Sequence, residues 1–172
     1  MRPLTEKTNQ EMKAIAAERG LALLAVETAG AGRFSVLRLV LERASGEAAT
    51  IEDCEAVSRE VSALLDASDE IGHRYTLEVS SAGLDRRLYS LEDARRFLGR
   101  RVVVRSNAAV VPEPIGPAGK AALLPSRNFR GTLEKVEDGM LTVVDGENRR
   151  IYNVRFADIR QVRLDFAWPE VK

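Results

Sequence analysis

The chain has 172 residues, of which 45% are hydrophobic, 5% are aromatic and 30% are charged. This is the composition of a globular protein with one ordinary domain or two small ones, and it excludes a disordered chain. The 26 basic and 26 acidic residues cancel, while a single cysteine and a single histidine exclude a disulfide framework and a metal site built from several of either residue.

The charges are unevenly distributed along the chain. Residues 1–85 hold 9 lysines and arginines against 15 acidic residues, and residues 86–172 hold 17 against 11. This change of sign suggests two modules, the second facing an anionic partner, although two domains that merely differ in composition would give the same numbers. No apolar run reaches the roughly 18 residues of a membrane span. The N-terminus has no apolar signal core, so we expect a cytoplasmic protein without membrane contact.

The first elements expected are a helix and two strands. Residues 8–19 have helical spacing, Thr8 and Glu11 stand at capping-box distance, and a glycine follows. Residues 21–27 and 34–42 have strand length and are separated by a glycine-containing turn. The second of these strands is largely apolar on both faces, which is typical of an inner strand.

A second helix and a third strand complete the first module. Thr50 and Asp53 form another capping signal, and apolar residues follow it at steps of mostly three and four as far as Leu65. Residues 75–80 alternate between apolar and polar, the period of a half-buried strand. The predicted order is therefore helix, strand, strand, helix, strand, and one sheet with two helices on one face is the economical packing.

The second module is expected to be mostly strands. Ser90 and Asp93 cap a short helix over residues 91–98, and a strand covers residues 101–105. Residues 106–128 have no period and contain several prolines and glycines, which predicts a long mobile loop. One helical turn is expected at residues 156–159. Further strands are expected at 131–136, 140–144, 149–154 and 160–166, and five short antiparallel strands suggest a small closed barrel of the SH3 or Sm type.

Four stretches carry a resemblance to a known family. They run from Ile51 to Arg59 (IEDCEAVSR), from Tyr75 to Arg86 (YTLEVSSAGLDR), from Phe129 to Leu133 (FRGTL) and from Phe156 to Ile159 (FADI). In order and spacing these stretches resemble the bacterial ribosome maturation factor RimP family over nearly the whole chain. The string EVSSxGLDR is the most specific part, and the family usually has a proline where this chain has Ala82.

The resemblance implies a fold and a function. The implied fold is α+β, with an N-terminal domain like the type II KH arrangement over residues 1–85 and a helix with an Sm-like barrel over residues 86–172. The implied function is non-enzymatic assembly of the small (30S) ribosomal subunit, by binding 16S rRNA and a small-subunit ribosomal protein. No metal, cofactor or small-molecule substrate is implied, and we expect a monomer.

Candidate binding residues lie at the junction and in the basic stretch after it. Small residues with a glycine let backbone N–H groups approach a partner closely, and guanidinium groups suit phosphate. A linker turn and a solvated helix face are the plain alternatives for the same residues. The predicted partner-binding or rRNA-binding residues are Ser80, Ser81, Gly83, Leu84, Asp85, Arg86, Arg87, Arg95, Arg96 and Arg101.

Two other classes of function are alternatives to this one. An Sm-type RNA-binding module acting as a chaperone of small RNAs would share the barrel, but such chaperones work as rings. An enzyme would need a nucleophile or paired titratable groups, and the sequence has no Gly-x-Ser-x-Gly elbow and no Walker-type phosphate loop. We therefore predict no catalytic residues.

Overall fold

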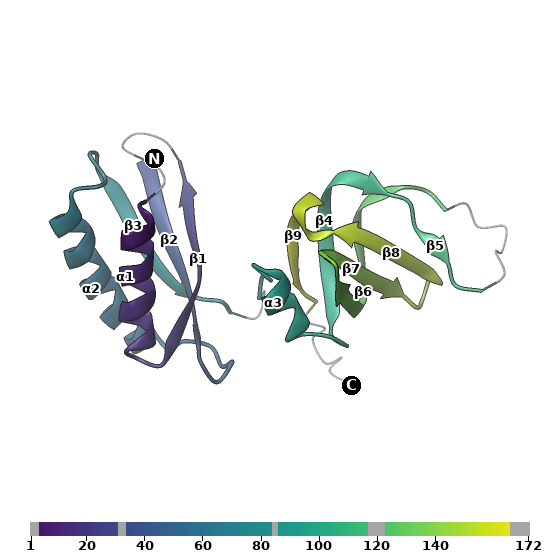
Figure 1. Ribbon diagram of the computed structural model, residues 1–172, viewed down its shortest axis with the longest axis horizontal. Helices are drawn as coiled ribbons and strands as arrows, with labels where there is room; N and C mark the ends of the chain where they lie inside the picture. The colour runs from purple at the N-terminus through teal and green to yellow at the C-terminus, as the bar shows by residue number, and fades with distance from the viewer. Residues whose placement is uncertain (1–3, 31–33, 84–85, 117–122, 166–172) are drawn as a thin grey trace, which may run out of the picture. The chain divides into compact units, whose positions relative to one another are not determined.

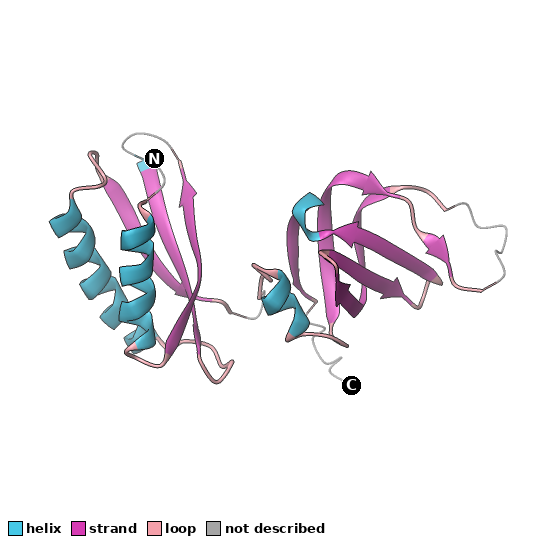
Figure 2. Cartoon of the chain, viewed as in Figure 1, coloured by secondary structure: helices cyan, strands magenta, loops and turns pink. Residues whose placement is uncertain are grey.

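The computed structural model describes residues 4–30, 34–83, 86–116 and 123–165. The chain divides into two compact units, unit 1 over Met1–Gly83 and unit 2 over Leu84–Lys172. The fold is α+β: unit 1 has two helices on one face of a sheet, and unit 2 consists mainly of strands (Figures 1 and 2).

Unit 1 has the element order predicted from the sequence. It consists of α1 (Glu6–Ala17), β1 (Leu21–Ala29), β2 (Ser35–Arg43), α2 (Ile51–Ser68) and β3 (Tyr75–Ser81). The sheet order is β1-β2-β3, with β2 antiparallel to β1 and parallel to β3, so the strand predicted to be inner is the central one. A parallel pair needs a long crossover, and α2 provides it.

The core of unit 1 follows from the alternation of β2. Leu37, Leu39 and Leu41 are fully buried, together with Met12 of α1 and Val57 of α2. Because alternate residues of a strand point to opposite faces, this leucine row forms the face that the two helices cover (Figure 1).

The predicted N-terminus is correct for α2 and wrong for α1. Thr50 and Asp53 form the predicted capping box of α2, each side chain accepting from the other residue's backbone N–H. In α1 the predicted start is wrong: Thr5 is the N-cap, and its hydroxyl accepts from the N–H of Thr8. Thr8 therefore lies inside the first turn and is buried. Both threonines have a hydroxyl that can cap a helix. The sequence prediction chose Thr8 because Glu11 follows it at capping-box distance, and that choice was wrong.

A carboxylate ties the start of α1 to the segment after α2. Glu70 accepts a hydrogen bond from the Thr5 N–H at 3.0 Å, from the Thr5 hydroxyl at 2.7 Å, and from the Thr8 hydroxyl. The bond from the Thr5 backbone and then those from the two hydroxyls hold the pKa of Glu70 below its ordinary value of 4.5, because they favour the ionised carboxylate.

We expect Glu70→Gln to lower the free energy of unfolding of unit 1 in a pH-dependent way. The pKa of Glu70 is lower in the folded protein than its ordinary value of 4.5. The ionised carboxylate therefore adds to the free energy of unfolding above pH 4.5, and this contribution is lost as the pH falls through the folded pKa. Denaturant unfolding of both proteins, at neutral pH and along an acidic series, should give stabilities that converge in acid. Glu55→Gln, at an exposed position of α2, is the control, and a Glu70 difference that stays constant down the series contradicts the prediction.

In its described residues, unit 2 is built from a short helix and six strands. They are α3 (Leu91–Arg95), β4 (Arg101–Val110), β5 (Glu113–Pro114), β6 (Ser126–Glu137), β7 (Met140–Asp145), β8 (Arg150–Arg155) and β9 (Ile159–Leu164), with the predicted helical turn η2 at Phe156–Asp158. The strand order is β5-β8-β7-β6-β4-β9. Its core contains the fully buried Val102, Val104 and Leu133, and Phe129 stacks on Tyr152 with ring centroids 4.2 Å apart.

Two predictions for unit 2 need correction. Five strands closed into a barrel were expected, but among the described residues the sheet has six strands and two edges, β5 and β9. The expected loop at 106–128 is partly strand: β4 continues to Val110, β6 begins at Ser126, and Glu113–Pro114 pair with β8. Proline is tolerated in β5 because that strand is at an edge. Residues 117–122, in the middle of the expected loop, lie outside the described residues.

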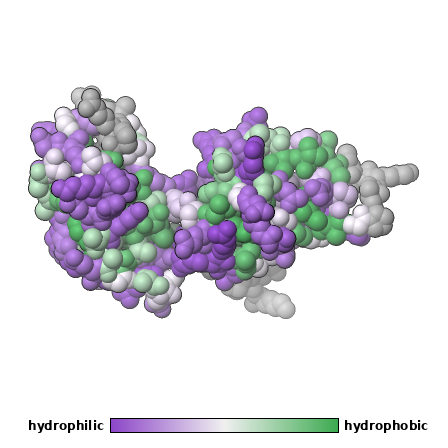
Figure 3. Space-filling model, viewed as in Figure 1, coloured by the Kyte–Doolittle hydropathy of each residue, from purple (hydrophilic) through white to green (hydrophobic). Residues whose placement is uncertain are grey.

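The described surface mixes polar and apolar side chains. In the space-filling view, hydrophilic and hydrophobic residues stand next to one another on both units (Figure 3). Such scattered apolar exposure is ordinary for a globular protein. The large apolar side chains that are exposed among the described residues are Phe34, Ile51, Leu98, Val111 and Leu124.

Candidate functional site

The end of β3 carries the predicted site residues of unit 1. Ser80 and Ser81 stand opposite Val40 and Leu41 of β2. The N–H of Gly83 donates to the Ser81 hydroxyl at 3.1 Å, and Gly83 has a φ of +62°, which favours glycine. This hydroxyl thus serves a local turn. Leu84 and Asp85 lie outside the described residues.

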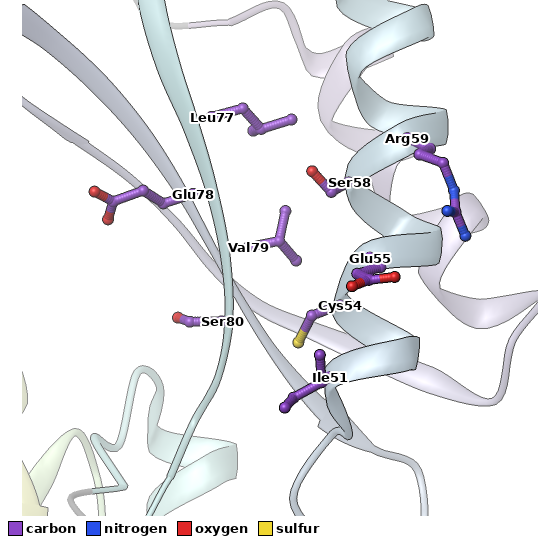
Figure 4. Close-up of a pocket in the computed structure, with 9 residues that line it drawn as sticks. All are labelled: Ile51, Cys54, Glu55, Ser58, Arg59, Leu77, Glu78, Val79 and Ser80. Atoms are coloured by element: carbon purple, nitrogen blue, oxygen red, sulfur yellow. The ribbon is translucent and has the colours of Figure 1, made fainter.

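A groove runs between α2 and β3, with a volume of about 700 Å³. Leu77 and Val79 point from β3 toward α2, whereas Glu78 and Ser80 point to the other face of the strand (Figure 4). Across from them, Ile51 is 75% exposed at the start of α2. The lining is completed by Cys54, Glu55, Ser58 and Arg59.

The thiol of the groove, Cys54, is not activated as a nucleophile. Burial, and secondarily the charge of Asp53, raise the pKa of the Cys54 thiol, which keeps it protonated and weakly nucleophilic. His73, the one histidine, is hydrogen-bonded to the Ser35 hydroxyl at 3.0 Å. What the groove offers is an apolar strip beside β3, which among the described residues is an edge strand of the sheet.

In unit 2, Arg86 is a structural residue. Its side chain is only 4% exposed, and its guanidinium donates to both carboxylate oxygens of Asp93, at 2.8 Å and 2.6 Å. The same guanidinium donates to the Arg87 carbonyl and lies 5.3 Å from the centroid of the Phe97 ring. Asp93 also accepts from the Tyr89 N–H at 3.0 Å. The pair is a buried, bidentate ion pair with further hydrogen bonds.

This environment gives Arg86 a structural role, while its predicted role as a contact residue stays a prediction. The guanidinium is held by Asp93 and packed against Phe97, so it ties α3 to the chain that precedes it. The backbone of Arg86 is also engaged, because its carbonyl accepts from the N–H of Leu164 in β9 at 2.9 Å.

The other predicted arginines of unit 2 differ in availability. Arg87 is half-buried and stands opposite Arg163 in an isolated bridge. Arg95 is exposed on α3, and Arg96 is exposed 3.5 Å from Asp93 and beside the Phe97 ring. Arg101 begins β4, with its side chain 46% exposed and ion pairs to Glu147 and Asp165. Arg95, Arg96 and Arg101 are the exposed arginines of the predicted set.

The structure brings Arg101 together with arginines outside the predicted set. On the outward face of the sheet, Arg105 follows it along β4, while Arg130 of β6 and Arg163 of β9 flank the residue between them. Arg101 and Arg105 are four residues apart in one strand, and this even spacing was a signal in the sequence that their side chains share a face. The strand pairing that adds Arg130 and Arg163 was not visible there.

Metal binding and membrane insertion find no support in the described part of the chain. Among the described residues there is no group of three or more histidine, cysteine, aspartate or glutamate side chains placed to hold a metal ion. Within the same ranges, no helix has the length and apolar character needed to cross a membrane.

Comparison with known families identifies the domain to which unit 1 corresponds. Residues 11–85 match a family model described as the RimP N-terminal domain. The match covers the second half of α1, both antiparallel strands, α2, β3 and the junction string. It therefore includes Ser80, Ser81 and Gly83.

Proposed function

Residues 11–85 belong to the RimP N-terminal domain family, and on this basis we propose that the protein is an assembly factor for the small (30S) ribosomal subunit. RimP proteins are ribosome maturation factors, and the match to this domain is the observation that carries the proposal. The proposed role is non-enzymatic and cytoplasmic, and the protein is proposed to act as a monomer that leaves before translation.

The charge distribution supports a division of labour between the units. Residues 86–172 carry six more basic than acidic residues, and a basic surface is attracted to the phosphates of 16S rRNA. Exposed Arg95, Arg96 and Arg101 are the proposed rRNA contacts of the predicted set. A small-subunit ribosomal protein is the second proposed partner, contacting the end of β3 near Ser80 and Ser81.

Two finer structural assignments go with this function. Unit 1 is proposed to be a KH type II-like domain, supported by its helix-strand-strand-helix-strand order. Unit 2 is proposed to be Sm-like, supported by the neighbouring strands β9-β4-β6-β7-β8, with β5 as an addition at one edge.

We expect the purified protein to co-sediment with free small subunits and not with large subunits or complete ribosomes. Binding should weaken with salt, because each neutralised phosphate releases counterions; with about three contacts the affinity falls about 40-fold between roughly 50 and 200 mM salt. Sedimentation at a series of salt concentrations measures both the selectivity and the slope.

Two outcomes would contradict the proposal. Equal binding to both subunits would indicate attraction to phosphate without selectivity. Failure to bind free small subunits, immature ones included, would remove the assembly role and leave the chaperone of small RNAs as the alternative, which predicts a ring-sized particle in size-exclusion chromatography.

A further inference from the structure

Three strands of unit 2 present a polar outward face. Their register places Arg130 of β6 and Arg163 of β9 on either side of Val103 in β4. Two residues along, Asn128 and Gln161 flank Arg105 in the same way. Residues directly opposite one another in a sheet share a face, and so do residues two apart in one strand. We call this surface, whose basic members are Arg101, Arg105, Arg130 and Arg163, the arginine face.

The arginine face concentrates positive charge. Its four arginines surround Val103. Across the strands, the Cβ atoms of Arg130 and Arg163 lie about 5 Å from that of Val103. Along β4, the Cα atoms of Arg101 and Arg105 lie about 7 Å from that of Val103. Arg101 forms ion pairs with Glu147 and Asp165. In the part of the chain that the structure describes, no ion pair joins a carboxylate to Arg105 or Arg130. Grouping like charges in this way is unfavourable for folding alone, so a bound anion is the natural counterpart.

The uncharged polar residues of the arginine face indicate which kind of anion it would bind. Thr132 stands opposite Arg101, and Asn128 and Gln161 flank Arg105, so hydroxyl and amide groups that bond to phosphate or ribose oxygens lie beside the charges. By contrast, the aromatic rings Phe129 and Tyr152 stack on each other in the core. Single-stranded nucleic acids are usually held by bases stacked on exposed aromatic rings, and the described residues of this face include none.

We propose that the arginine face binds the backbone of double-stranded RNA, through its phosphates and ribose hydroxyls. A-form RNA displays these groups across a wide, shallow groove and is recognised mainly by shape. A sheet with charges spaced over three strands can meet several phosphates at once without reading bases. This inference rests on the proposed function, since it gives rRNA a contact surface, and it specifies helical rather than single-stranded rRNA.

The test compares two RNAs and two double variants of the full chain. The RNAs are a duplex of about 16 base pairs, the span that double-stranded RNA-binding domains cover, and a single strand of the same length. The variant is Arg105→Gln/Arg130→Gln, both at exposed positions. The control is Arg127→Gln/Arg160→Gln, which removes the same charge from exposed positions of β6 and β9. Arg127 is next to Asn128 in β6, and Arg160 lies at the register shift between the Arg105–Gln161 and Ser106–Ile159 pairs, so neither control residue is opposite a member of the arginine face.

The wild-type protein should bind the duplex more tightly than the single strand. The Arg105/Arg130 variant should lower the steepness of the salt dependence by about two, since each lost phosphate contact removes about one, and the control should change it less. Equal affinity for the two RNAs, or the same loss in variant and control, would overturn the inference. Circular dichroism of both variants checks that each remains folded.

Sedimentation with small subunits separates this inference from the proposed function. If the wild-type protein binds the duplex through the arginine face but not small subunits, the assembly role fails and the RNA surface stands. The opposite result is also informative. If the wild-type protein binds small subunits, and the Arg105/Arg130 variant binds RNA and subunits as well as the control does, then the assembly role stands and the arginine face is the wrong surface.

Discussion

Replacing Arg86 with alanine is expected to lower the free energy of unfolding of unit 2 by about 3–5 kcal/mol, the usual effect of removing one partner of a buried ion pair. The loss arises because Asp93, with a side chain only 8% exposed, would be left charged beside the core without its bidentate donor. Asp93→Ala should be at least as costly, since it also removes the acceptor of the Tyr89 N–H. Denaturant unfolding monitored by hydrogen exchange of the backbone amides measures the stability of each unit separately.

Arg95→Gln is the matched control for this prediction. Arg95 is also an arginine at α3, but it is exposed, so its replacement should change stability by less than about 0.5 kcal/mol. The double variant Arg86→Ala/Asp93→Ala should lose less than the sum of the single losses, because the two residues are in direct contact. Additive losses, or an Arg86 effect as small as that of Arg95, would show that the ion pair is not what holds this part of unit 2.

The Arg86 pair also shows what charge density along the sequence leaves open. Seven basic residues between positions 86 and 105 stand against only Glu92 and Asp93, which suggests a solvated basic surface. The structure places Asp93 against Arg86, seven residues away, and removes both from the surface. Charge density along the chain does not distinguish a binding arginine from a buried, paired one, because that difference depends on where the chain turns.

What the sequence predicted well was governed by local periodicity. The leucine row of β2 and the capping box of α2 involve neighbours within a few residues, and both are present as expected. Pairing between distant segments was harder to foresee. The register that assembles the arginine face joins Val103 to Arg130 and Arg163. The loop prediction failed for the related reason that Glu113 and Pro114 gain their strand conformation from β8.

Gly131→Ala is expected to destabilise unit 2 by about 1–3 kcal/mol or more, the range for overpacking a filled interior. Gly131 lies in β6 where the strand passes from pairing with β4 to pairing with β7. A Cβ atom there would lie 2.4 Å from the carbonyl oxygen of Val144, 2.6 Å from its carbonyl carbon and 2.9 Å from the backbone nitrogen of Asp145. These are backbone atoms of β7, so relief requires moving one strand of the sheet rather than turning a side chain.

Gly146→Ala separates this steric effect from the general effect of replacing a glycine. Gly146 is in the same unit, does not have a positive φ, and has no atom within 4 Å of the position that an added Cβ would take. Its replacement should be neutral or stabilise the protein by up to about 1 kcal/mol, since alanine restricts the unfolded chain. Denaturant unfolding of both variants measures the contrast. If Gly131→Ala were as stable as Gly146→Ala, β6 and β7 would have to separate easily at Val144, and the close approach of these two strands would not be what requires glycine at position 131.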